Sequence, residues 1–111
     1  MSRVFVYEIP RTMDMKTAEG FGAVTPIVTR DRRRPSVFNP NDFSDFVVDE
    51  LSVAKFDPET DFICVAGQLI GNVLLVAAAV SAYSNVKLLI WDASSEEYKS
   101  RELTASASAA G

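Results

Sequence analysis

Histidine is absent from the 111-residue sequence, and cysteine occurs only once, at Cys64. Without histidine the chain lacks the usual general base near neutral pH and the commonest metal ligand. A single cysteine cannot form a disulfide within the chain or complete a zinc site of the Cys/His kind. We therefore expect a non-catalytic protein with no metal and no cofactor, in which Cys64 is a reduced, buried thiol.

Long hydrophobic runs are missing as well. The longest uninterrupted apolar stretch is residues 73–80, and the wider segment 69–83 is too short to cross a bilayer. Near the N-terminus, Glu8 interrupts the apolar residues before they reach the length of a signal-peptide core. The sequence therefore predicts a cytoplasmic protein with no membrane partner.

The net charge of −4 is unevenly distributed along the chain. Residues 1–40 contain seven basic and four acidic residues, whereas residues 41–111 contain four basic and eleven acidic ones. Such a division is typical either of an arm that binds a polyanion or of two halves that attract each other.

Two apolar runs of strand length flank a helix-length segment in the second half of the chain. Residues 61–66 and 86–91 are nearly all apolar, and residues 69–83 between them predict a helix. This pattern indicates a βαβ unit over about 61–91, which requires two parallel strands. Asn39-Pro40 and an apolar stripe after them predict a second helix over about 40–55.

The remaining segments predict shorter elements. Residues 4–9 and 23–29 favour strands, with Pro26 restricting the second to a sheet edge or a bulge, and residues 11–23 between them are expected to form a loop. Residues 98–103 favour a short edge strand. We predict one α/β domain over residues 1–103, with a small, partly parallel sheet and short N-terminal strands. Residues 104–111, almost all alanine and serine, are expected to form a mobile tail.

A run of four arginines interrupted by one aspartate is the most distinctive polar feature. We predict that residues 30–34 form a hairpin turn before a short return strand at residues 36–38. Guanidinium groups bind phosphate well, so the turn is a candidate nucleic-acid contact. The alternative is a solvated turn that pairs with the acidic residues of the helix over 40–55. The candidate residues are Arg30, Arg32, Arg33 and Arg34.

The helix over 69–83 contains no charged residue, and its apolar side chains divide by size. At 100° per residue, its larger residues lie on one broad face, which we expect to pack on the sheet. Small residues on the other face would let a second backbone approach closely. We therefore predict a homodimer through Gly71, Ala78 and Ala82, with the first helix of the same chain as the alternative neighbour.

The expected strand ends suggest a further alternative, a small nucleotide-binding or metal-dependent enzyme. Gly67 and Gln68 lie at a strand-to-helix turn, the position of phosphate-binding loops, but the third glycine of a dinucleotide fingerprint is missing. Carboxylates at Glu8, Asp61 and Asp92 would suit magnesium if they gathered. Tight turns and emerging strands explain the same residues without any ligand.

Several segments resemble small proteins of unknown function encoded by tailed bacteriophages. The resemblance rests on Arg3-Val4-Phe5-Val6, Asp61-Phe62-Ile63, Gly67, Ala77-Ala78-Ala79, Leu88-Leu89-Ile90-Trp91-Asp92 and Tyr98. It covers about half of the chain, and Gln68 and Leu69 depart from it where those proteins have a charged residue and a proline. The resemblance implies a phage origin, and hence the host cytoplasm, without implying an activity.

We therefore interpret the chain as a non-catalytic accessory protein that binds a host or phage protein. Binding of nucleic acid through the arginine turn and chemistry at the strand ends remain the two alternatives.

Overall fold

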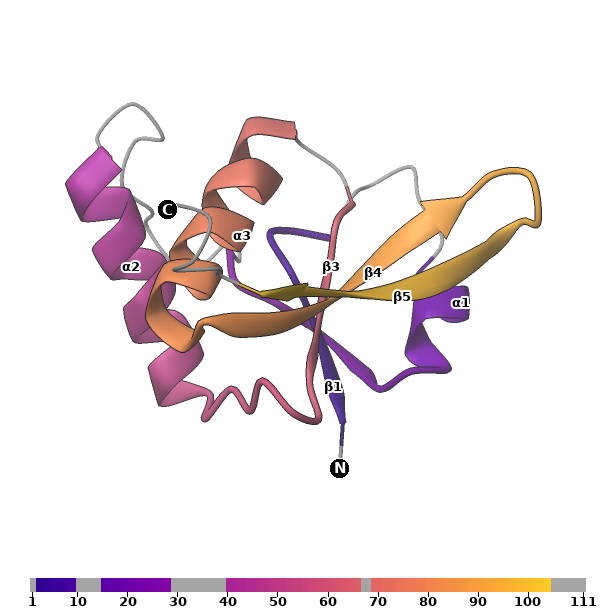
Figure 1. The fold of residues 1–111 in the computed structure, drawn as a ribbon, viewed down its shortest axis with the longest axis horizontal. Coiled ribbons are helices and arrows are strands. Elements are labelled where there is room, and N and C mark those ends of the chain that lie inside the picture. The colour runs from indigo at the N-terminus through magenta and orange to yellow at the C-terminus, as the bar shows by residue number, and fades with distance from the viewer. Residues whose placement is uncertain (1, 10–14, 29–39, 67–68, 105–111) are drawn as a thin grey trace.

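The computed structural model describes residues 2–9, 15–28, 40–66 and 69–104. Strands and helices alternate along most of the chain before it ends in two consecutive strands (Figure 1). In chain order the elements are β1 (Arg3–Val6), α1 (Lys16–Glu19), β2 (Ala23–Pro26), α2 (Pro40–Val53), β3 (Phe62–Cys64), α3 (Leu69–Tyr83), β4 (Asn85–Asp92) and β5 (Glu97–Thr104).

The five strands form one sheet in the order β2-β1-β3-β4-β5. All neighbouring pairs are parallel except β4 and β5, which are antiparallel. The predicted α/β class, the βαβ unit and the second helix are confirmed by β3, α3, β4 and α2. Pro26 lies on the edge strand β2, as its missing N–H requires.

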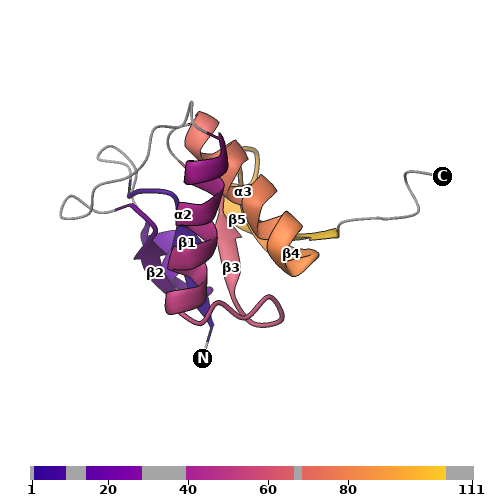
Figure 2. The same cartoon turned by 90° about the vertical axis from the view of Figure 1, so that its left-hand side faces the viewer.

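The two faces of the sheet bury different sets of side chains because neighbouring residues of a strand point to opposite sides. On β1 and directly after it, Phe5 and Tyr7 pack with residues of α2 and α3, whereas Val4 and Val6 pack with Ala18 of α1. Figure 2 shows α2 and α3 side by side over the strands. The larger core therefore lies on the α2–α3 face.

The N-terminal region differs from the expected loop over residues 11–23. It includes α1, a single helical turn whose Ala18 is fully buried against the sheet. So short a helix has no apolar period to reveal it, and it packs on the sheet through Ala18 and the adjoining Met15. At the other end, β5 extends to Thr104. Residues 105–111 lie outside the described part of the chain, so the division into a domain and a tail stays a prediction.

Candidate functional site

The strand order reverses between β1 and β3, and in open α/β sheets ligands bind at the carboxyl edge beside such a point. At this edge, the buried side chain of Asn72 in α3 bonds to the backbone of Ala66, two residues after β3. Its Nδ2 donates to the carbonyl of Ala66 at 2.8 Å, and its Oδ1 accepts from the N–H of Ala66 at 3.4 Å. Asn72 therefore holds the chain that follows β3 in place against α3. Gly67 and Gln68 lie outside the described residues.

The strand-end carboxylates lie apart. Asp61 precedes β3 at the amino edge, whereas Asp92 ends β4 at the carboxyl edge. Asp92 accepts from the N–H and hydroxyl of Ser94 and pairs with Lys99 at 2.7 Å. These contacts, that of Lys99 first, lower the pKa of the Asp92 carboxyl. Within the described ranges, no three acidic or cysteine side chains are grouped as a metal site.

Asp61 instead joins the amino ends of two strands. Its carboxylate accepts from the N–H of Arg3 at 2.9 Å, from the Arg3 guanidinium at 3.1 Å and from the N–H of Asp57 at 2.8 Å. The Arg3 guanidinium also donates to the carbonyls of Ala54 and Lys55, which follow α2. This buried carboxylate therefore stabilises the fold.

The single thiol is inert. Cys64 is fully buried on the α1 face of the sheet, as predicted, and burial raises its pKa to about 11. Burial and the neighbouring Cys64 raise the pKa of Tyr98 to about 12. Both groups stay protonated at neutral pH, and nucleophilic chemistry would need the thiolate.

The orientation of α3 differs from the one we expected. Its small residues Gly71, Ala78 and Ala79 are buried, whereas Leu69 and Val73 are 75% and 52% exposed. The reason is space: a Cβ on Gly71 would lie 2.5 Å from ring atoms of the fully buried Tyr7. The close approach predicted for a second subunit is thus made within the chain.

This orientation leaves an apolar row along the side of α3 that faces β4 and β5, which we call the α3 seam: Leu69, Val73, Val76 and Val80. All four line a groove of about 470 Å³ between α3 and the β4–β5 strands. Leu88 of β4 and Leu103 of β5 contribute to its lining. We call this the seam groove. Sequence patterning identified the seam residues as one face and assigned that face to the core. Val76 and Val80 are half-buried and do pack against the core, whereas Leu69 and Val73 are exposed.

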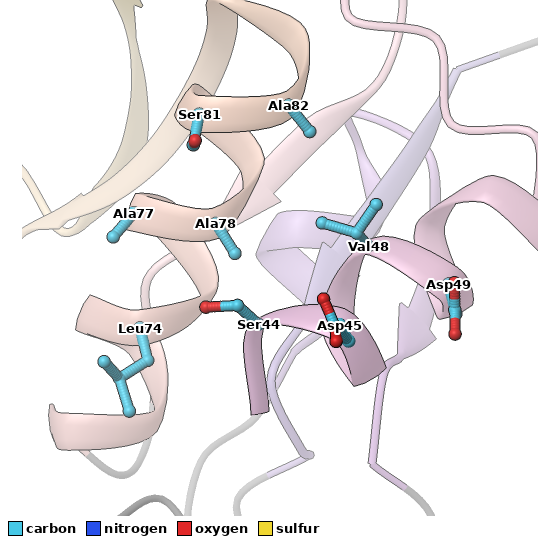
Figure 3. A pocket seen from close by; sticks show the side chains of 9 residues that line it. All are labelled: Ser44, Asp45, Val48, Asp49, Leu74, Ala77, Ala78, Ser81 and Ala82. Atoms are coloured by element: carbon cyan, nitrogen blue, oxygen red, sulfur yellow. The ribbon is translucent and has the colours of Figure 1, made fainter. Parts of the chain in front are cut away.

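A second groove, of about 570 Å³, lies on the other side of α3 (Figure 3). Ser44, Asp45, Val48 and Asp49 of α2 line one wall, and Leu74 with small residues of α3 lines the other. We call it the acidic groove, because two exposed aspartates lie on its α2 side. The predicted interface residues Ala78 and Ala82 line it too, the first buried and the second exposed.

Other predictions remain open. The candidate nucleic-acid residues Arg30, Arg32, Arg33 and Arg34, and the expected hairpin around them, lie outside the described residues. The predicted homodimer is also untested, although two of its three proposed contacts, Gly71 and Ala78, are buried. Among the described helices, none has the length and hydrophobicity needed to cross a membrane.

The sequence model of one protein family, described as phage Pam3 gp32-like protein, matches residues 2–105. No curated protein and no solved structure matches the chain.

Proposed function

Because the chain belongs to the phage Pam3 gp32-like protein family, we propose that it is a non-catalytic accessory protein that binds a host or phage protein. We place this action in the cytoplasm of the infected cell. The observation that carries the proposal is the α3 seam, on an uncharged helix whose Leu69, Ile70 and Val73 are 75%, 45% and 52% exposed. Clustered exposed apolar side chains beside a groove are typical of a protein-binding surface.

The two alternative functions have less support. A net charge of −4 is unusual for a protein whose main ligand is nucleic acid. If the arginine run did bind DNA or RNA, affinity would fall steeply with salt, and replacing Arg32, Arg33 and Arg34 would remove that dependence. The enzyme alternative needs carboxylates that gather at one site. Asp61 instead lies at the amino ends of the parallel strands and Asp92 at their carboxyl ends.

Affinity capture from phage-infected host cells tests the proposal with two matched variants. Val73→Glu places a charge in the α3 seam, whereas Val53→Glu makes the same change at the end of α2, where Val53 is 80% exposed and lines neither groove. We expect the Val73 variant to lose a captured protein that wild type and the Val53 variant retain. Equal recovery by all three proteins would refute binding through the seam.

A further inference from the structure

The seam groove lies where a further helix would pack if helices continued to alternate with strands after β4. A parallel sheet continues from strand to strand through helices that pack on its faces, as α3 does between β3 and β4. After β4, however, residues 93–96 form a turn that leads directly into the antiparallel β5. In the described part of the chain, no helix follows α3 over β4 and β5. Leu103 therefore stays 36% exposed where it lines the groove, beside Leu88, which is 8% exposed and also packs in the core.

The α3 seam has the spacing of a helix-pairing surface. Its residues, at positions 69, 73, 76 and 80, are separated by four, three and four residues. This is the alternation by which two helices interlock along an apolar row. Because α3 has no charged residue, none of its side chains would place a charge against an apolar partner helix. The missing element is thus best supplied by another helix with an apolar row.

We propose that a second copy of this chain supplies that helix, and that two α3 helices pair along their seams across a twofold axis. The inference rests on the proposed function and names the bound phage protein as the chain itself. Seam and groove adjoin on one surface, so each copy offers a helix to its partner's groove and a groove to its partner's helix. A twofold interface requires this self-complementarity.

The groove also determines how the helices are oriented. Leu88 and Leu103 lie beneath the incoming helix, so the partner's own sheet must lie on the opposite side of the helix layer. A twofold axis parallel to α3 satisfies this condition and makes the two helices parallel. The outer side of α3 then lies under the partner's β4 and β5. Its exposed residues there, including Ile70 and Ala77, are uncharged.

Charges on the two sides of α3 support the same arrangement. Arg101 of β5 is opposite Leu88 in the antiparallel register and so shares the sheet face that lines the seam groove. On the other side of α3, Asp45 and Asp49 line the acidic groove (Figure 3). A twofold axis along the seam interchanges these sides, which brings Arg101 of each copy toward the acidic groove of the other. Such rim pairs fix orientation more than they add affinity.

Light scattering after gel filtration, at micromolar concentrations, tests the pairing. We expect wild type and Val53→Glu to have twice the 12.1 kDa mass of the chain, and Val73→Glu to have the mass of one chain. Circular dichroism confirms that the variants are folded. A wild-type protein that stays at 12.1 kDa overturns the inference, as does a dimer that Val73→Glu leaves intact.

Cysteine cross-linking tests the parallel orientation, because the native Cys64 is buried and does not interfere. Under mild oxidation, Leu69→Cys is expected to form a disulfide-linked dimer, whereas Val53→Cys is not. In an antiparallel pair, residue 69 would face residue 80, so linkage only in the Leu69→Cys/Val80→Cys double variant overturns the proposed geometry.

Two further outcomes separate this inference from the proposed function. A monomeric wild type whose capture of infected-cell protein still depends on Val73 overturns the second copy and leaves the proposed function standing. A monomer whose capture is independent of Val73 overturns both. If removal of residues 105–111 converts a monomer into a dimer, the chain's own C-terminal segment occupies the groove, and the inference is wrong.

Discussion

Replacing Asp61 with alanine should destabilise the protein more than any exposed substitution in the same turn. The Asp61 side chain is 1% exposed and accepts hydrogen bonds from the N–H groups of Arg3 and Asp57 and from the Arg3 guanidinium. Alanine would leave these three donors without their acceptor. Asp61 is thus a buried connection between β1 and the turn that precedes β3.

The magnitude follows from what each donor loses. A buried donor left unsatisfied costs about 1–3 kcal/mol, and removing one partner of a buried ion pair costs about 3–5 kcal/mol. The Arg3 side chain is 31% exposed and can turn toward water, which reduces its share. We therefore expect the free energy of unfolding to fall by about 3 kcal/mol, a large part of the ~5–15 kcal/mol typical of a domain.

Urea unfolding measures this change through the single tryptophan. Trp91 contacts the ring of Tyr98 at a centroid distance of 5.1 Å, so its fluorescence should change when the sheet separates. Asp57→Ala is the matched control, since its exposed carboxylate accepts from the N–H of Glu59, and we expect it to lose at most about 1 kcal/mol. Equal losses for the two variants would refute the assignment of Asp61 as a buried connection.

Two further predictions concern the core. Gly71→Ala should lower the free energy of unfolding by about 1–2 kcal/mol in the same urea assay, because the cost of overpacking against Tyr7 exceeds the gain in helix propensity. Gly20→Ala is the control and should be neutral or stabilising, since its new Cβ would meet only a carbonyl at 3.4 Å. Because the pKa of Cys64 rises from 9.0 to about 11 on folding, the unfolded chain loses this proton first, so stability should decline from pH 9 to 11 in wild type and decline less in Cys64→Ala; identical pH profiles would contradict this.

The sequence predicted the parallel part of the fold because buried strands leave a direct signal. The apolar runs around Ile63 and Leu88 have no solvent-facing alternation, and Asn39-Pro40 marks the start of α2. By contrast, α1 is one turn whose only buried residue is Ala18, and no period exists over four residues.

The candidate site was missed for a different physical reason. Apolar residues of α3 occur on all sides of the helix, so its pattern does not indicate which side faces the core. The side is chosen by side-chain volume: the Tyr7 ring leaves room for Gly71 but for nothing larger. That constraint comes from a residue 64 positions earlier in the chain, beyond the reach of any local pattern.

The character of the two edge strands limits how this protein can associate. β5 carries Glu97, Lys99, Arg101 and Glu102 among its eight residues, and the opposite edge, β2, is four residues long and contains Pro26. Charged, short or proline-containing edges discourage the addition of strands from other molecules. The backbone therefore offers poor templates for fibrillar aggregation, and contact between copies through the strand edges is discouraged at both ends of the five-stranded sheet.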